Sequence, residues 1–265
     1  MKNRISCFLM VTWNILFLIS VLLFVFQRRI YLIRSWERLE NSEKYKTVKL
    51  EAEDGNPVDL RFIDNGEDVD VFVMFGNVIE ERMYVSLDIL MKNIGIQCNV
   101  FSYFYRGFLN NPGRATEEET MRDLQAVGKY LKTRKKRQFA FAFSFGCAVV
   151  LKLANINNFE GIVLINPFAS LRSTVESIYI FKPVACFLVD TWDNVRAIKK
   201  VKNTPILIFT SEQDSVVPPE HSAILKRNNE DAKQEILLKI DHNDIFKRVV
   251  MVKILMFLKN MIINV

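Results

Sequence analysis

The stretch from Phe139 to Leu153 constrains the fold of this chain more than any other feature. An apolar run, Phe139–Phe143, leads directly into Ser144, and a second apolar run begins directly after it. A strand that turns sharply into a helix lifts a serine hydroxyl above the sheet, and it needs small neighbours such as Ala142 and Gly146 because helix and strand approach closely there. The pattern predicts a nucleophilic serine. The motif is Ala-x-Ser-x-Gly, however, and an ordinary serine at a helix start remains the alternative.

Short apolar runs alternate with longer periodic segments in the rest of the chain. The short runs predict strands and the longer segments predict helices. The expected strands are Thr47–Ala52, Val58–Ile63, Val69–Phe75, Cys98–Tyr103, Phe139–Phe143, Gly161–Ile165, Pro205–Thr210 and Glu235–Ile240. The expected helices are Glu80–Asn93, Glu117–Lys132, Phe145–Asn155, Val195–Lys200, Pro219–Asn228 and Asp244–Ile262. A hairpin at Asp54-Gly55-Asn56 followed by strand–helix units predicts an α/β fold, a mostly parallel eight-stranded sheet with helices on both faces.

A nucleophilic serine needs an imidazole to take its proton and a carboxylate to orient that imidazole. The chain has two histidines. His242 lies in the loop after the last expected strand, whereas His221 lies at an expected helix start. Asp214 follows the strand Pro205–Thr210. The order Ser144, Asp214, His242 is that of α/β-hydrolases, and all three residues lie just beyond strand ends, so we predict that they are the catalytic residues.

The negative charge that develops on an attacked carbonyl oxygen needs N–H donors that are already in place. One expected donor is the backbone N–H of Phe145, directly after Ser144. The second is expected from the loop after Val69–Phe75, where we select the backbone N–H of Asn77. An ordinary tight turn at Gly76-Asn77 is the alternative.

A second apolar run, Ile5–Phe26, contains 22 residues and no charge. At 1.5 Å per residue it would span roughly 33 Å as a helix, enough for a bilayer core of about 30 Å. We therefore expect a single-pass membrane anchor within residues 1–40, in the endoplasmic reticulum or the plasma membrane. A cleaved signal peptide is the alternative, but its apolar stretch is shorter, about 7 to 15 residues. The flanking basic residues favour a cytoplasmic domain by a small margin.

The remaining composition excludes several classes of protein. The net charge is +6, and it falls to +4 without residues 1–26, because Lys2 and Arg4 are then lost. A charge of this size indicates ordinary solubility and no nucleic-acid partner. The four cysteines form no C-x-x-C pair, which argues against zinc ribbons, thioredoxin chemistry and a disulfide-stapled secreted fold.

Several further motifs follow one another in a familiar order. They are Tyr105-Arg106-Gly107-Phe108, Pro112-Gly113 with Thr116-Glu117 and Asp123, Ile165-Asn166-Pro167-Phe168-Ala169-Ser170, Val217-Pro218-Pro219-Glu220-His221 after Asp214, and His242-Asn243-Asp244. With the N-terminal apolar run, they resemble the membrane-anchored eukaryotic α/β-hydrolase-domain proteins of the Bem type. The resemblance covers nearly the whole chain.

The resemblance implies an α/β-hydrolase fold over residues 41–265, a Ser144–Asp214–His242 triad, and no metal or organic cofactor. It also implies that His221 is a helix-start histidine and not the base. Residues 167–204 would form a short lid, and the apolar run Ile180–Leu188 within it favours an acyl or lipid substrate near a bilayer. Simple packing of this run on the sheet is the alternative.

The chain departs from the family pattern mainly where the family has glycine. Ala142, Cys147, Ser211, Leu109 and Asp241 occupy positions where glycine is common, and Phe75 stands where the family usually has histidine.

The predicted function is a serine hydrolase that cleaves a carboxylic ester or thioester. The alternatives are a non-catalytic member of the fold that binds a lipid or a protein partner, and a serine peptidase.

Overall fold

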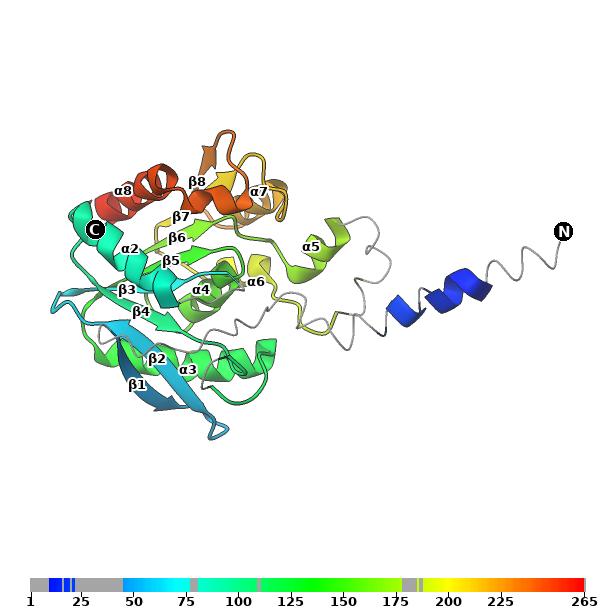
Figure 1. The fold of residues 1–265 in the computed structure, drawn as a ribbon, viewed down its shortest axis with the longest axis horizontal. Helices are drawn as coiled ribbons and strands as arrows, with labels where there is room; N and C mark the ends of the chain where they lie inside the picture. Colours follow the sequence, from blue (N-terminus) through cyan, green and yellow to red (C-terminus); the bar gives the residue numbers. More distant parts are fainter. Residues whose placement is uncertain are drawn as a thin grey trace.

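The computed structural model of this chain describes residues 10–15, 17–19, 21, 45–76, 81–108, 111–177, 185 and 188–264. Its centre is an eight-stranded sheet with the strand order β1-β2-β4-β3-β5-β6-β7-β8 (Figure 1). The strands are β1 (Lys46–Glu51), β2 (Pro57–Ile63), β3 (Val69–Met74), β4 (Asn99–Tyr103), β5 (Arg137–Phe143), β6 (Gly161–Ile165), β7 (Ile206–Ser211) and β8 (Ala232–Leu237).

One strand, β2, runs against the rest of the sheet. β1 pairs antiparallel with β2, and β2 pairs antiparallel with β4, whereas the pairs from β4 to β8 are parallel. Gly55, with φ of +75°, lies in the turn between β1 and β2, where the sequence predicts a hairpin. Parallel strands place their carboxyl ends at one edge, and sites in open α/β sheets are built there.

Helices cover both faces of the sheet (Figure 1). α2 (Glu81–Asn93) and α8 (Arg248–Asn264) meet on one face, where Lys259 Nζ donates to the Ile94 carbonyl over 2.7 Å. The other face carries α3 (Glu117–Thr133), α4 (Gly146–Ala154), α6 (Asn194–Ile198) and α7 (Glu220–Arg227), packed as neighbours in that order. A short helix, α5 (Leu171–Ser177), follows β6, and a 3-10 helix, η2 (His242–Phe246), follows β8.

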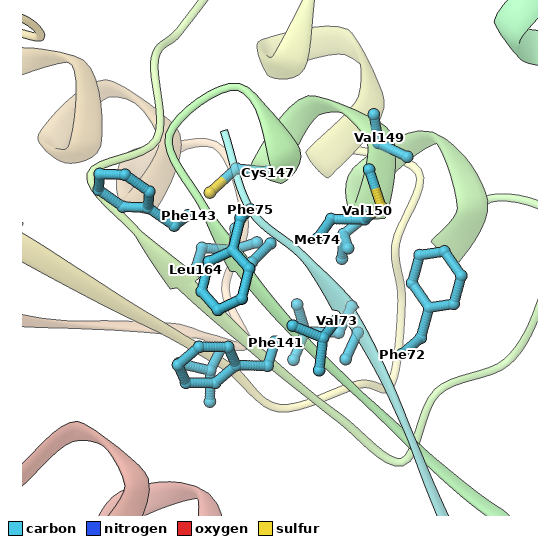
Figure 2. Close-up of a cluster of buried hydrophobic side chains, with 14 of the residues drawn as sticks. Phe72, Val73, Met74, Phe75, Phe141, Phe143, Cys147, Val149, Val150 and Leu164 are labelled. Carbon is cyan, nitrogen blue, oxygen red and sulfur yellow. The ribbon is translucent and has the colours of Figure 1, made fainter. Parts of the chain in front are cut away.

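The central strands are buried on both faces, as parallel strands between two helix layers should be. In β5 phenylalanine alternates with alanine, so that Phe139, Phe141 and Phe143 lie on one face and Ala140 and Ala142 on the other. Figure 2 shows Phe141 in this core together with Val73, its register partner on β3. The small alanine face lets α4 approach the sheet closely at the end of β5.

The predicted α/β fold with its mostly parallel sheet is confirmed, and three elements differ from expectation. The C-terminal helix was expected from Asp244, but residues there belong to η2 and α8 begins at Arg248, because the backbone is extended at Lys247. The last strand was expected at Glu235–Ile240, but β8 begins three residues earlier, because β7 pairs with Ala232 through Leu237. The chain then turns at Lys239, where φ is +57°. Helix α5 was not expected, because Leu171 is its only buried residue and it therefore shows no apolar period.

The predicted anchor and lid lie partly outside the described residues. Within Ile5–Phe26 the structure describes residues 10–15, 17–19 and 21, which are helical. Among all described residues, no helix is both long and apolar enough to cross a membrane. In the lid, residues 178–184 and 186–187 fall outside the described part of the chain.

Candidate active site

Ser144 lies in a sharp turn between β5 and α4. Its φ is +53°, in the left-handed region, and its N–H donates to the Ile165 carbonyl on β6 over 2.8 Å. A non-glycine residue in this region carries strain of about 1–3 kcal/mol, which the surrounding structure must offset. A Cβ atom on Gly146 would lie 2.3 Å from the Met74 carbonyl oxygen, so that only glycine fits there. The predicted strand–turn–helix unit is therefore present.

The structure brings the three predicted site residues into hydrogen-bond contact. His242 Nε2 lies 3.1 Å from Ser144 Oγ, and His242 Nδ1 lies 2.7 Å from Asp214 Oδ2. Asp214 comes from the loop after β7, and His242 begins η2 after β8. The His242 side chain is 6% exposed and the Asp214 side chain 1%, so water competes little for the bond between them.

The Asp214 carboxylate is oriented by its own loop. Its Oδ1 accepts hydrogen bonds from the backbone N–H groups of Val216 at 2.9 Å and Val217 at 2.7 Å. These bonds leave Oδ2 for His242. A carboxylate at Nδ1 favours the tautomer with the proton on Nδ1, which makes Nε2 an acceptor for the serine hydroxyl.

His221 lies at the start of α7 and serves the main chain instead. It is buried, and its Nδ1 accepts a hydrogen bond from the Ala169 N–H over 3.1 Å. Burial lowers the pKa of His221, so it is a neutral acceptor at neutral pH. His242, and not His221, faces Ser144.

The structure describes one of the two residues predicted to donate a backbone N–H to the oxyanion, namely Phe145. Phe145 follows Ser144 as the N-terminal cap of α4, and its ring packs against Tyr105, Phe168 and Trp192, with the Trp192 centroid at 4.8 Å. Asn77 lies outside the described residues. The preceding Gly76 is described, and a Cβ atom there would lie 3.5 Å from Ser144 Cβ. The loop after β3 therefore reaches Ser144.

Aromatic rings line the histidine side of the site. The Phe143 ring lies 4.9 Å from the His242 ring, and Phe246 contacts both Phe143 and Phe75, with centroids at 5.1 Å and 5.9 Å. Phe75, the departure from the family histidine, is buried in this group. Apolar walls lower the local dielectric and strengthen hydrogen bonds inside the site.

Sequence reasoning missed three residues near His242: Asn166 and Asp241 bind its main chain, and Ser211 binds Asn166. Asn166 lies in the motif after β6, and that position was a usable signal. Ser211 and Asp241 were noticed only as missing glycines. Hydrogen bonds from the N–H groups of Ser215 and His242 lower the pKa of Asp241, so this residue is a carboxylate at neutral pH.

Among the residues that the structure describes, the site shows neither a metal-binding cluster nor a reactive thiol. In the described part of the chain, no three His, Cys, Asp or Glu side chains gather where they could hold a metal ion. Cys147 lies three residues after Ser144 and is buried, and burial raises the pKa of its thiol well above the usual range. The Cys147 thiol is therefore protonated and points to the Ile165 carbonyl at 3.4 Å.

Solved structures with the same fold define the class. An esterase from Pyrococcus furiosus, Pf2001, matches with a TM-score of 0.67 and 18% identity over 88% of this chain and 97% of that chain. Est1E from Butyrivibrio proteoclasticus, solved with ferulic acid bound, matches with a TM-score of 0.63 and 15% identity over 81% and 99% of the two chains. The protein thus has the α/β-hydrolase fold.

Three relatives that resemble the chain in sequence give a more specific comparison than these structures. The protein bem46 of Schizosaccharomyces pombe is 26% identical over 159 residues, which cover 56% of this chain and 53% of that protein. The human α/β-hydrolase domain-containing protein 17B is 27% identical over 156 residues, 57% of this chain and 52% of that protein. An uncharacterized membrane protein of Saccharomyces cerevisiae is 27% identical over 143 residues, 51% of this chain and 50% of that protein.

These relatives confirm the resemblance found in the motifs: the chain is related to the Bem-type α/β-hydrolase-domain proteins. It spans about half the length of these three curated relatives. No protein-family model matches the sequence.

Proposed function

We propose that this protein is a serine hydrolase that cleaves a carboxylic ester or thioester. The observation that carries the proposal is the continuous contact from Asp214 through His242 to Ser144, at 2.7 Å and 3.1 Å. Such a chain of contacts activates a hydroxyl that is otherwise a weak nucleophile. Ser144 is the nucleophile, His242 the general base and then acid, and Asp214 the residue that orients His242.

The reaction has two steps in this proposal. Ser144 Oγ attacks the carbonyl carbon while its proton passes to His242 Nε2, and the charged oxygen is held by the N–H groups of Phe145 and Asn77. His242 then protonates the leaving alcohol or thiol, which leaves an acyl group on Ser144. A water molecule, deprotonated by His242, releases the acid and restores the serine.

We assign an acyl or lipid substrate to this site and a single-pass anchor to Ile5–Phe26. The aromatic rings of Phe143, Phe246 and Phe75 around His242 support an apolar acyl group. The length of the N-terminal run and the description of the Saccharomyces cerevisiae relative as a membrane protein support membrane attachment, in the endoplasmic reticulum or plasma membrane. On this proposal the enzyme acts as a lipase or acyl-thioesterase at the membrane.

The proposal is tested with the full chain in membranes, on panels of acyl esters and acyl thioesters of increasing chain length. The wild type should hydrolyse at least one panel, and Ser144→Ala and His242→Asn should each lose on the order of 10³-fold or more in kcat. His221→Asn is the matched control, because it changes the other histidine and should keep the activity. Equal activity in the wild type and Ser144→Ala would exclude the proposed mechanism.

A further inference from the structure

We infer that Asn166, Ser211 and Asp241 form a polar clamp that fixes the main chain of His242 and so positions its imidazole between Asp214 and Ser144. The inference rests on the proposed hydrolase function. It assigns a positioning role to residues that do not touch the substrate. Two of them, Ser211 and Asp241, occupy positions where the resembling family commonly has glycine.

Within the clamp, Asp241 binds His242 on its N-terminal side. Its Oδ1 accepts hydrogen bonds from the His242 N–H at 2.7 Å, from the Ser215 N–H at 2.8 Å and from Ser215 Oγ at 2.9 Å. Ser215 directly follows Asp214. One carboxylate therefore joins the residue after the acid to the main chain of the base.

Asp241 is also held in place by η2. It is the N-terminal cap of this 3-10 helix, and its own N–H donates to Asp244 Oδ2 over 3.3 Å in a capping box. A capping box satisfies two backbone N–H groups at a helix start reciprocally. These bonds hold the backbone at His242, the first residue of η2.

Within the clamp, Asn166 binds the carbonyl of His242, and Ser211 binds Asn166. Asn166 Nδ2 donates to the His242 carbonyl at 3.3 Å and to Ser211 Oγ at 3.0 Å, while Asn166 Oδ1 accepts from the Ser211 N–H at 2.8 Å. Both side chains are buried, and Asn166 has φ of +49°, a conformation that asparagine tolerates better than most residues. The Ser211 hydroxyl therefore completes a contact that glycine would lack.

The clamp matters because a general base works only within a narrow geometry. Misplacement of a catalytic group by about 1 Å can reduce a rate on the order of 10²-fold. Both main-chain polar groups of His242 are bonded to clamp side chains, and Asp214 bonds its imidazole. Ser211 and Asp241 therefore add contacts that glycine would lack, and substitution of either residue by glycine should weaken the site.

The test compares kcat and KM of the 265-residue chain in membranes on p-nitrophenyl butyrate. Asp241→Gly should lower kcat about tenfold, Ser211→Gly about threefold, and the double variant further, with KM within about twofold of the wild type. Asp241→Asn should recover most of kcat, because its amide oxygen still accepts from His242 and Ser215. A merely structural role would not produce this split or this recovery.

Asp64→Gly is the matched control. Asp64 accepts a hydrogen bond from the Gly66 N–H in the turn between β2 and β3, at the opposite edge of the sheet from Ser144. This variant should change stability without changing kcat. If Asp241→Gly does not fold, kcat and KM are measured for Asp241→Asn and Ser211→Ala instead. Each of these variants should show a small fall in kcat with KM close to that of the wild type.

The outcomes separate the two proposals. A wild type that hydrolyses the ester while both glycine variants keep its kcat overturns the clamp alone. If the wild type hydrolyses no ester or thioester, and Ser144→Ala is no less active than the wild type, the hydrolase function is overturned and the clamp with it. Reduced kcat in the glycine variants with recovery in Asp241→Asn supports both.

Discussion

At the scale of single residues, the turn at Ser144 depends on the absence of one side chain. Gly146 lies so close to the end of β3 that an added Cβ would meet the Met74 oxygen at 2.3 Å and the Phe75 oxygen at 2.7 Å. These atoms belong to the backbone and cannot rotate away. The sequence motif predicts a small residue here, and the structure gives the reason.

Gly146→Ala should therefore destabilise the fold by about 3 kcal/mol and misplace Ser144, because β3 and α4 must separate. Urea unfolding measures the first effect and ester hydrolysis the second. Gly128→Ala in α3 is the control, since its added Cβ would meet side-chain atoms and no backbone: Ile156 Cγ2 at 2.9 Å and Leu153 Cδ1 at 3.4 Å. A stable and fully active Gly146→Ala would contradict the close approach of strand and helix.

Other residues show what sequence alone does not reveal. Ser144, Asp214 and His242 could be predicted because their chemistry and their order along the chain restrict the choice. The roles of Asp241 and Ser211 could not, because each depends on contacts across the fold, to Ser215 over 26 positions and to Asn166 over 45. A comparison with family motifs marks both residues only as deviations.

At the scale of elements, Arg106 ties the β1–β2 hairpin to α3. Its guanidinium bonds Asp54 in the hairpin turn at 2.6 Å and 2.9 Å, and Asp123 on α3 at 2.6 Å and 2.8 Å. Arg106 and Asp123 are buried, so the bonds between these two residues are only weakly screened by water, whereas Asp54 is exposed. The family motif marks Arg106 and Asp123, but nothing in the sequence indicates that Asp54 joins them.

This pairing predicts how stability depends on pH. The hydrogen bonds from Arg106 hold the pKa of Asp54 well below its usual range. A depressed folded-state pKa contributes stability that is complete above the unfolded-state pKa of about 3.9 and is lost as the pH falls through the folded-state value. Asp54→Asn should therefore be less stable than the wild type at pH 7, and the difference should shrink steadily below about pH 4.

Urea unfolding at a series of pH values measures this difference. Asp68→Asn serves as the control, because Asp68 is an exposed aspartate that lies before β3, away from Arg106. A difference between wild type and Asp54→Asn that stays constant from pH 7 to pH 3 would contradict the ion pair with Arg106.

The elements also differ in how well their sequences predict them. The strands from β1 to β7 have apolar runs bounded by turn residues, and their positions follow from those runs. Ile236 in β8 is 56% exposed and Leu238, directly after β8, is 68% exposed, so the apolar pattern there does not mark the paired residues. Pairing with β7 decides the position of β8, and a local pattern does not contain that information.

At the scale of the whole molecule, the few glycines and the two histidines have different structural roles. Five of the nine glycines have positive φ, and Gly146 allows a close approach. Of the two histidines, His221 binds the main chain after β6 and His242 faces Ser144. The parallel sheet brings residues 144, 214 and 242 together at one edge, so the fold positions the site more than any local motif does.

The proposed anchor gives a prediction at this scale. Removal of residues 1–40 should release the chain from membranes into the alkaline carbonate wash, while the full chain stays in the pellet. The activity on short soluble esters should survive, because no residue of the site lies before residue 41. Release of the full chain by carbonate would contradict a membrane-spanning Ile5–Phe26.

The central claim is that Ser144 is an activated nucleophile, and a fluorophosphonate probe tests it most directly. The full chain in membranes is labelled, and the modified peptide is identified by mass spectrometry, beside Ser144→Ala, His242→Asn and the control His221→Asn. The account predicts one adduct, on Ser144, that is present in the wild type and His221→Asn and absent in the other two variants. An unlabelled wild type, or an adduct that persists in Ser144→Ala, would contradict it.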